Sequence, residues 1–513
     1  MNGDGPSLEL PLPAQAQPTT SNELRAKRPM NIVDLTVDIP FSSRATLSSD
    51  ERPKPRWKTP EFRFYVAAAC VVVPIMSWVP YTLSVSSHPN YPFYKSRLSD
   101  GWLFGRKVDN SDAQYRSFRN NIPALTATAS IYLLTKAIFV RLTGKARQDN
   151  LHHIPFNLIF SLIMLAALHG SSALKVLFIL SLNFALVKAT GASRFGPLLI
   201  WIFNGLVLLA NDRYHGYQFG DIADGLAFLD SWSGLYPRWH VSFNISMLRL
   251  VSFGMDHYWA CRRTGPLDSG KNLNEKARVT TVHPIDMYSY TNFLSYIIYS
   301  PLYIAGPVMT FNDYIWQHRR PTPIPWRLAL GYACRFVICL LTMEFILHFM
   351  YVVAIKESKA WGGDTPAQVS MIGFWNLVIV WLKLLLPWRF FRLWALMGGI
   401  DPPENMVRCV ANNYSTFGFW RSWHRSYNLW IIRYIYVPLG GAKNVVVNTL
   451  LVFTFVALWH DLTFKLLAWG WLVSLFVIPE LMARYLLPSS KVRSFHPLST
   501  SPFAYSYTRV TTI

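Results

Sequence analysis

Residues 412–441 read NNYSTFGFWRSWHRSYNLWIIRYIYVPLGG, and residues 448–467 read NTLLVFTFVALWHDLTFKLL. Each stretch holds a tryptophan–histidine pair, Trp423-His424 in the first and Trp459-His460 in the second. The second pair ends an apolar run long enough to cross much of a bilayer. A titratable ring at membrane depth is costly and rare, so it is a functional-site hypothesis by default. We therefore predict that the chain builds a membrane chamber around His460.

The composition favours a membrane protein. The chain has 513 residues, of which 51% are hydrophobic, 15% aromatic and only 15% charged, whereas soluble domains carry roughly 25% charged residues. The net charge is +21, and the Lys and Arg residues lie in loops between apolar runs, which is typical of positions beside anionic headgroups. No nucleic-acid motif accompanies the charge. We therefore expect membrane lipids as partners, and no nucleic acid.

The five cysteines are scattered, without a CxxC pair or the spacing of a zinc site. We interpret them as packing residues, because a buried free cysteine usually behaves as a small hydrophobe. The sequence thus predicts no metal site and no bound cofactor.

Three regions are expected along the chain. Residues 1–60, rich in Pro, Ser and Thr, are predicted to be a disordered tail, residues 61–487 a membrane domain, and residues 488–513 a polar C-terminal tail. Because a span needs about 20 apolar residues, we predict an all-α bundle of about ten transmembrane spans. They are residues 64–85, 122–140, 154–169, 173–190, 195–210, 288–309, 328–353, 370–397, 445–460 and 464–487.

The segment 211–261 is more mixed in polarity. Within it Arg249, Ser252 and Asp256 recur at helical spacing and would share one helix face. One interpretation is a polar face turned to water or headgroups. The other is an intramembrane ion pair that faces a cavity.

The first tryptophan–histidine pair lies in an amphipathic pattern. If residues 419–434 form one helix, its aromatic residues would lie at headgroup depth and its cations toward phosphate. The first face would hold Trp420, Trp423, His424, Tyr427, Ile431 and Tyr434, and the second Arg421, Arg425, Asn428 and Arg433. Pro438 and Gly440-Gly441 would then end the helix. The simplest interpretation is an anchoring helix without further chemistry.

The second pair ends the run 445–460. Phe453, Val456 and Ala457 would share a face with His460, so its ring is expected among apolar groups, where burial favours the neutral imidazole. A neutral imidazole can serve as a general base toward a hydroxyl. The alternative is a core histidine bonded to a backbone carbonyl, or one at the interface beside Asp461.

Several catalytic signatures are missing from the sequence. There is no GxSxG nucleophile elbow, no HxxxxD pair, no Asp-His-His-Cys run, and neither a Walker A motif nor HExxH. The two tryptophan–histidine pairs remain as the candidates for chemistry.

The string FWRSWHRSYNLWIIRYIYVPLGG, residues 419–441, resembles the signature of the membrane-bound O-acyltransferases (MBOAT), in which a second apolar helix ends in Trp-His, here Trp459-His460. The stretches SFNISMLRLVSFGMDHYW (242–259) and VALWHDLTFKLLAWGW (456–471) are most similar to the fungal glycerol-uptake branch, whose members are relatives of Hedgehog acyltransferase. The likeness extends over about residues 60–487.

The resemblance implies a helical bundle with an internal chamber that acyl-CoA enters from the cytosolic side. It implies that His460 is catalytic and that His424 assists, at a position where the family carries Asn, Asp or His. We predict further substrate contacts from Trp423, Arg421, Arg425, Asn428 and Trp459, with the two arginines as candidates for CoA phosphates.

The resemblance to the fungal branch also implies an acceptor and a location. The expected reaction is transfer of a fatty acyl chain to a lysolipid hydroxyl, with a lyso-GPI anchor as the favoured acceptor. The expected location is the endoplasmic reticulum membrane, with the plasma membrane as a second site. Two other functions stay open: a proton-coupled glycerol or polyol transporter, and a protein acyltransferase or an inactive regulator.

Overall fold

The computed structural model describes residues 57–143, 149–266, 273–413, 416–460 and 463–486. The tails expected at 1–60 and 488–513 lie outside the described residues, apart from residues 57–60. There Thr59 caps the first helix, because its hydroxyl accepts a hydrogen bond from the Phe62 amide at 3.4 Å. This helix, α1, begins at Pro60, one residue before the start that the sequence predicts for the membrane domain.

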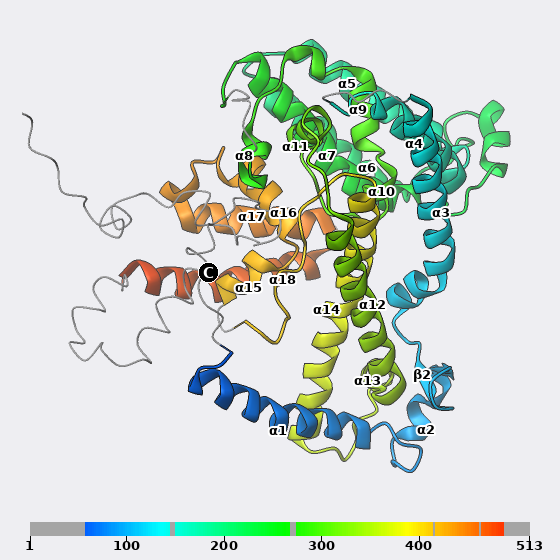
Figure 1. Ribbon diagram of the computed structural model, residues 1–513, viewed down its shortest axis with the longest axis vertical. Helices are drawn as coiled ribbons and strands as arrows, with labels where there is room; N and C mark the ends of the chain where they lie inside the picture. Colours follow the sequence, from blue (N-terminus) through cyan, green and yellow to red (C-terminus); the bar gives the residue numbers. More distant parts are fainter. Residues whose placement is uncertain (1–56, 144–148, 267–272, 414–415, 461–462, 487–513) are drawn as a thin grey trace, which may run out of the picture.

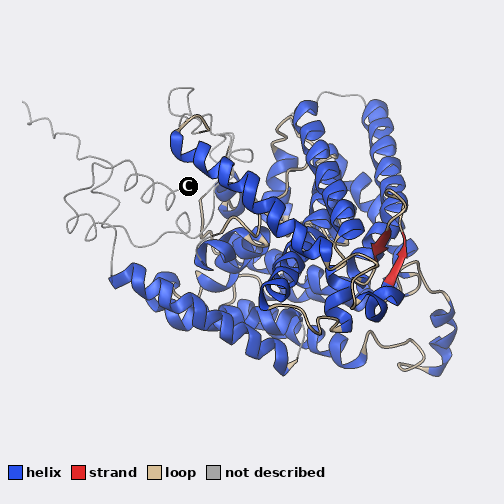
Figure 2. Cartoon of the chain, turned by 90° about the horizontal axis from the view of Figure 1, so that it is seen from below, coloured by secondary structure: helices blue, strands red, loops and turns tan. Residues whose placement is uncertain are grey.

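The described chain is almost wholly helical, which confirms the predicted all-α class (Figures 1 and 2). The longer helices are α1 (Pro60–Thr82), α3 (Ala113–Thr143), α4 (His153–His169), α5 (Ser172–Thr190), α6 (Gly196–Tyr214), α7 (Trp239–Cys261), α12 (Trp326–Phe349), α14 (Pro366–Met397), α17 (Val445–His460) and α18 (Phe464–Leu486).

Short helices and one small hairpin connect them. The helices are α2 (Tyr91–Tyr94), η3 (Lys95–Arg97), η4 (Asp224–Ser231), α8 (Glu275–Thr280), η5 (Ile285–Met287), α9 (Tyr290–Ile297), α10 (Ser300–Tyr303), α11 (Phe311–Arg319), α13 (Val352–Ser358), α15 (Thr416–Ser422), α16 (Arg425–Ile431), η6 (Ile432–Tyr436) and η7 (Gly441–Asn444). The antiparallel strands are β1 (Leu98–Asp100) and β2 (Lys107–Asp109), with Ser99 opposite Val108.

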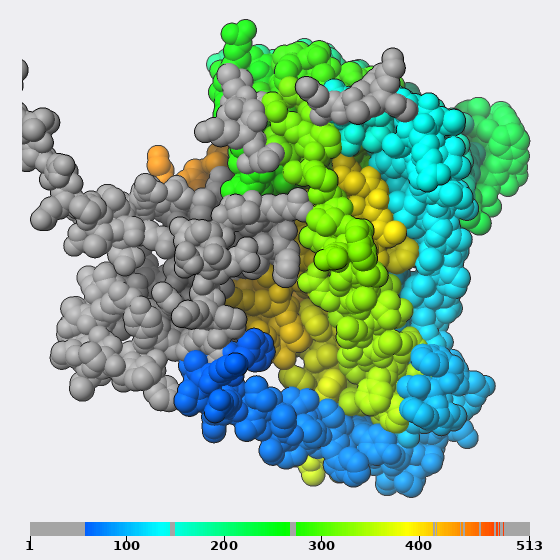
Figure 3. Space-filling view, viewed as in Figure 1, coloured from blue at the N-terminus to red at the C-terminus, as the bar shows by residue number. Residues whose placement is uncertain are grey.

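Five described helices, α1, α3, α5, α12 and α14, are long and apolar enough to cross a membrane, and three shorter apolar helices lie at His153–His169, Val447–His460 and Phe464–Phe476. In Figure 3, α12 lies at the front and α1 along the lower edge. On α12, Leu330, Ile338 and Leu341 form an exposed apolar row, as expected of a lipid-facing helix. The chain is therefore a multi-pass membrane protein, although the predicted count of ten spans is not confirmed.

One predicted span, residues 288–309, is wrong. The chain there forms the short helices η5, α9 and α10 and then continues without regular structure. Pro301 and Pro307 lack the amide hydrogen that a continuous helix needs, and a side chain on Gly306 would lie 2.4 Å from the Cα atom of Leu302. Residues 293–303 are all buried, so their apolar character reflects the protein interior and not contact with lipid.

Helix α7 lies inside the bundle, packed against α5, α6, α9 and α11 (Figure 1). Arg249, Ser252 and Asp256 on this helix are all buried, so the interpretation of a face turned to water is wrong. Arg249 donates to the carbonyls of Ile297 and Leu302 at 2.7 and 2.5 Å. It therefore holds the broken segment 288–309 against α7.

The ion pair of α7 is formed with a residue far along the chain. Asp256 binds the guanidinium of Arg433, on η6, at 2.8 Å, and accepts a hydrogen bond from the Tyr434 hydroxyl at 3.1 Å. Asp256 thus does form an ion pair, but with Arg433 and not within the face of α7, and the pair is packed in the interior and does not face a cavity as expected. It ties α7 to the segment that carries the first histidine.

Candidate active site

The first tryptophan–histidine pair lies at a break between two short helices. α15 ends at Ser422, α16 begins at Arg425, and His424 between them has φ 45° and ψ 51°. A continuous helix over 419–434 is therefore wrong, because a left-handed residue cannot continue a right-handed helix. His, Asn and Asp are enriched among the non-glycine residues that adopt this conformation. Such strain concentrates at functional sites, where surrounding structure holds it in place.

The first turn of α16 is capped from a distant loop. The backbone amide of Arg425 donates to the carbonyl of Asn405, and the amide of Ser426 donates to the side-chain oxygen of Asn405, both at 3.0 Å. The hydroxyl of Ser426 in turn accepts from the amide of Val308 at 2.9 Å. These bonds satisfy amides that a helix start leaves open, and they fix the backbone that follows His424.

Aromatic rings connect the two histidines. The His424 ring stacks on Trp388 of α14, with ring centres 4.4 Å apart and planes at 24°. Its ring centre also lies 5.1 Å from that of Tyr427, and the Tyr427 ring lies 4.7 Å from that of Trp459. The Trp459 ring lies 4.8 Å from His460. The structure thus brings both predicted histidines into one site, joined by Tyr427 and Trp459.

His460 is the last residue of α17 and opens into a cavity of about 220 Å³. The other lining residues come from the end of α6 and the start of α7, and from α17 itself: Leu208, Asn211, Asp212, His215, His240, Val241, Asn244, Leu458 and Trp459. The His460 side chain is exposed. The cavity wall at the helix end is of mixed polarity, with Leu208, Val241, Leu458 and Trp459 lying among the polar residues, so the expected apolar surroundings are found only in part. Asp461, the predicted alternative neighbour, lies outside the described residues.

Trp459 fixes the end of α17. Its side chain is buried, and its indole N–H donates to the carbonyl of Asn244 on α7 at 3.0 Å. Because a buried indole needs a hydrogen-bond acceptor, this contact sets the position of α17 relative to α7. It also sets the direction from which His460 enters the cavity.

The charged residues around His424 point inward, contrary to the expected interfacial helix. Arg425 is 1% exposed and forms an ion pair with Glu275 of α8 at 2.9 Å. Arg433 is bound to Asp256 and lies over the Trp259 ring, 4.6 Å from its centre. Two of the four residues predicted to face phosphate are therefore paired inside the protein. Arg425 stabilises the site and is closed to a CoA phosphate in this structure.

The other predicted contacts are partly exposed. Trp423 stacks on Phe419 at 5.2 Å, and Arg421 and Asn428 lie nearby on α15 and α16. The side-chain nitrogen of Asn428 is buried and has no hydrogen-bond partner among the described residues. Arg421 is thus the more accessible of the two arginines predicted to contact CoA.

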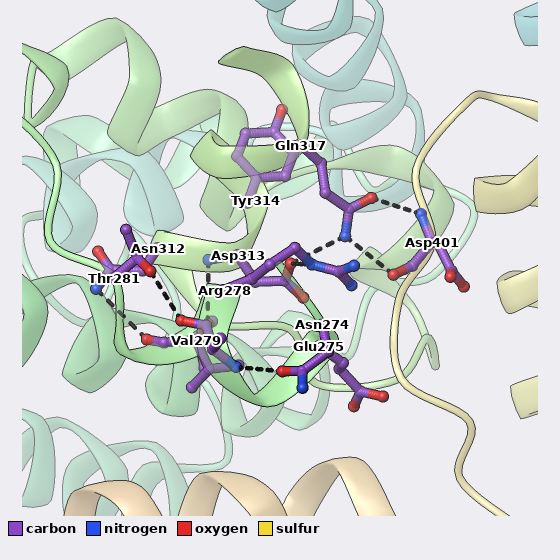
Figure 4. A network of polar contacts seen from close by, with 12 residues as sticks. Asn274, Glu275, Arg278, Val279, Thr281, Asn312, Asp313, Tyr314, Gln317 and Asp401 are labelled. Carbon is purple, nitrogen blue, oxygen red and sulfur yellow. Dashed lines mark hydrogen bonds and ion pairs between the residues drawn. The ribbon is translucent and has the colours of Figure 1, made fainter. Parts of the chain in front are cut away.

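A buried polar network supports α8, which carries Glu275 (Figure 4). Asn274 caps α8 by accepting from the amide of Ala277 at 2.9 Å. Arg278 binds Asp313 of α11 at 2.6 Å, and Gln317 bonds to both Asp313 and the carbonyl of Asp401 at 3.0 Å. Because Glu275 binds Arg425 directly after His424, this network positions the strained turn. The sequence analysis did not identify these residues, although acidic residues are few in this chain and could have been marked as candidates for buried ion pairs.

Sequence reasoning also missed the polar wall of the cavity. Asn211, Asp212 and His215 follow an apolar run at the end of α6, and His240 and Asn244 lie in the first turns of α7. The change from apolar to mixed polarity at residue 211 was visible in the sequence. The proximity of this segment to His460 was not visible, because about 250 residues separate residue 211 from His460.

The electrostatics of His424 favour an uncharged ring. Burial, and to a lesser degree the nearby His460, lowers the pKa of His424 to about 3. The residue lies between α15 and α16, outside the five long apolar helices. At neutral pH it therefore has one nitrogen that donates a hydrogen bond and one that accepts. Such a ring can orient a hydroxyl or stabilise a developing oxyanion.

The backbone at His424 leads to a stability prediction. Replacing His424 with valine is expected to lower the free energy of unfolding by about 1–2 kcal/mol relative to asparagine, because a β-branched residue resists the left-handed region. The two side chains are similar in size, so asparagine is the matched control. Melting temperatures of the two purified variants test this. Equal temperatures would show that the turn relaxes and that its conformation is not imposed.

Comparison with known proteins gives a consistent result. A family model for the membrane-bound O-acyltransferase family matches residues 221–504. "Membrane-bound O-acyltransferase GUP1" of Saccharomyces cerevisiae is 49% identical over 440 residues, covering 83% of this chain and 78% of that protein. The Candida tropicalis protein of the same name is 44% identical over 453 residues, 86% of this chain and 76% of that protein. Mouse "Protein-cysteine N-palmitoyltransferase HHAT" is 30% identical over 235 residues, 42% of this chain and 45% of that protein.

Proposed function

The chain belongs to the membrane-bound O-acyltransferase family, and we propose that it transfers a fatty acyl chain from acyl-CoA to a lipid hydroxyl at His460. The observation that carries the proposal is the joined pair of histidines, with His460 open to a polar cavity and His424 held in a strained turn next to it. Acyl transfer needs a general base that can reach the hydroxyl of the acceptor and a hydrogen-bond donor for the developing oxyanion. His460 and the neutral imidazole of His424 can supply these two groups.

The proposed reaction has two steps at the thioester. His460 takes the proton of the acceptor hydroxyl while that oxygen forms a bond to the thioester carbonyl carbon, and negative charge develops on the carbonyl oxygen. The carbon–sulfur bond then breaks, and the proton passes from the imidazolium to the departing CoA thiolate. His424 donates a hydrogen bond to the oxyanion or orients the acceptor. Its stack on Trp388 fixes the ring plane for this role.

The donor is proposed to be acyl-CoA, as the family resemblance implies. Arg421 is the arginine that we propose for a phosphate contact, since Arg425 is buried against Glu275. Trp423, Asn428 and Trp459 are proposed as contacts for the acyl chain and the acceptor. Trp459 forms part of the cavity wall beside His460.

The acceptor is proposed to be the sn-2 hydroxyl of a lyso-GPI anchor, in the endoplasmic reticulum membrane. Similarity to the fungal proteins over more than four-fifths of this chain supports O-acyl transfer, and the choice of acceptor and location follows from the resemblance to the fungal branch.

The acceptor proposal has a direct test in cells. Deleting the gene is expected to leave lyso-forms among the lipids of GPI-anchored proteins, because the second acyl chain is no longer added. Mass spectrometry of lipids released from purified GPI proteins measures this. The same strain carrying the intact gene is the control, and unchanged anchor lipids would exclude this acceptor.

A protein acceptor is the second candidate, because one relative is named as a protein-cysteine N-palmitoyltransferase. A labelled fatty acid found on the N-terminus of a protein, with no labelled lipid product, would favour it. The transporter hypothesis loses its main support, because Arg249, Ser252 and Asp256 all bond within the protein.

A further inference from the structure

The cavity beside His460 contains polar atoms that the protein leaves unsatisfied. Asn211 is 2% exposed, and neither its amide oxygen nor its amide nitrogen has a hydrogen-bond partner among the described residues. The Nδ1 atom of His240 is also buried without such a partner. Buried polar groups are normally hydrogen-bonded, and an unmade bond is unfavourable. Two unsatisfied groups in one cavity wall indicate a ligand that completes them.

The chemistry of these groups selects the ligand. An amide offers an acceptor oxygen and a donor nitrogen side by side, which matches a hydroxyl that both donates and accepts. Among the described residues that line the cavity, Asp212 is the single carboxylate and none is Lys or Arg. Such a wall suits hydroxyl groups and disfavours the several phosphates of a CoA nucleotide, which arginine and lysine usually bind.

The size of the cavity leads to the same choice. Its volume is about 220 Å³, whereas pockets for drug-sized ligands measure roughly 300–1,000 Å³. The CoA nucleotide is larger than such ligands and must lie elsewhere. A small polyol group fits the space, and its position next to His460 places it at the end of the acceptor where the proton is removed.

We propose that this cavity binds the hydroxyl-bearing polar group of the acceptor lipid, with Asn211 as a specificity-determining residue that bonds to a hydroxyl near the one His460 deprotonates. This assignment rests on the proposed acyl transfer. His240 packs closely against the backbone of Gly216, since a side chain at that glycine would lie 2.5 Å from its Nδ1 atom, and Gly216 has φ +89°. The His240 ring is therefore held in place at the cavity wall.

The chain offers a matched control for Asn211. Asn183 on α5 is 0% exposed, and both of its amide atoms also lack a partner among the described residues. It does not line the cavity. Replacing either asparagine with leucine removes a buried amide of the same kind, but only Asn211→Leu changes the cavity wall.

The kinetic test uses the full-length protein in lipid nanodiscs, with oleoyl-CoA and lysophosphatidylinositol. Asn211→Leu is expected to raise the KM for lysophosphatidylinositol about tenfold and to leave the KM for oleoyl-CoA unchanged, while Asn183→Leu changes neither. Asn211→Ser, which replaces the amide by a hydroxyl that can still donate and accept a hydrogen bond, is expected to recover part of the loss. An unchanged acceptor KM in a folded Asn211→Leu protein would overturn the assignment.

A binding test needs no turnover. Lysophosphatidylinositol is expected to raise the melting temperature of the parental protein, at a concentration about tenfold below that required of lysophosphatidic acid with the same chain, which lacks the polyol. Equal effects of the two lipids would overturn the assignment. If the parental protein shows this preference, and Asn211→Leu loses it, yet no acyl chain is transferred to any acceptor, the proposed function fails and only the binding of a polyol group by the cavity stands.

Discussion

Replacing His460 with alanine is expected to reduce acyl transfer by about 10²–10⁴-fold, the usual contribution of a general base. His460 is the one predicted catalytic group that both lines the polar cavity and adjoins the aromatic contacts to His424. Because its ring is exposed at the end of α17, alanine leaves no buried void there. The anchoring bond from Trp459 to Asn244 stays in place. The loss should therefore appear in kcat and not in folding.

The measurement is single-turnover transfer of a labelled acyl chain, with elution profile and melting temperature recorded on the same sample. His88→Ala is the control, since that histidine lies in the loop before α2, on a part of the chain distant from α17 (Figure 1). Transfer at the parental rate by folded His460→Ala protein would reject the mechanism. If His424→Ala lost transfer and His460→Ala did not, His424 would be the general base and His460 the assisting residue.

The pH dependence separates the two histidines further. Protonation of a general base removes it, so the rate should fall as pH falls through the titration of the base. Because the pKa of His424 is lowered to about 3, that ring stays neutral above pH 5 and contributes no step there. His424→Asn is therefore expected to lower the rate without moving the midpoint of the acidic limb. A shifted midpoint would assign the titration to His424.

The helices were largely readable from the sequence, and the reason is physical. Apolar length predicts a helix wherever a segment must satisfy its backbone hydrogen bonds within lipid. Nine of the ten predicted spans lie mainly on one helix each, although 328–353 runs past the end of α12 into α13. The wrong prediction of a span at 288–309 also comes from relying on apolar length. An apolar run cannot show whether lipid or protein surrounds it, and α7, the helix inside the bundle, was left out because its buried polar residues made it look mixed.

The structure places both predicted histidines in one candidate site, whose geometry the sequence did not predict. Both histidines are brought together as expected, yet the left-handed turn at His424 leaves no mark in the hydrophobic periodicity. It gives a physical reason for a histidine at this position, because Asn, Asp and His are enriched among the non-glycine residues that adopt this conformation. Arg425 and Arg433 looked like interfacial cations, since their acidic partners Glu275 and Asp256 lie 150 and 177 residues away in sequence.

Replacing Asp256 with alanine is expected to lower the free energy of unfolding by about 3–5 kcal/mol, because it leaves the Arg433 guanidinium as an uncompensated charge in the interior. Asp256 is 0% exposed and binds Arg433, Tyr434 and the amide of Asn312. A typical domain is stable by only about 5–15 kcal/mol, so most of this protein should be lost during purification. Activity should fall with it, since the pair holds η6, which follows α16 and its His424 turn, against α7.

The double variant Asp256→Ala/Arg433→Leu separates charge from packing. Removing both ions abolishes the unpaired charge, and replacing buried ion pairs by apolar side chains is often nearly neutral. The double variant should therefore be more stable than Asp256→Ala alone, although the contacts of Arg433 with the Trp259 and Tyr434 rings are lost. Yield of monodisperse protein and melting temperature in detergent measure both variants. If the single variant were as stable as the parent, water would have to reach Asp256, and the interior position of the ion pair would be disproved.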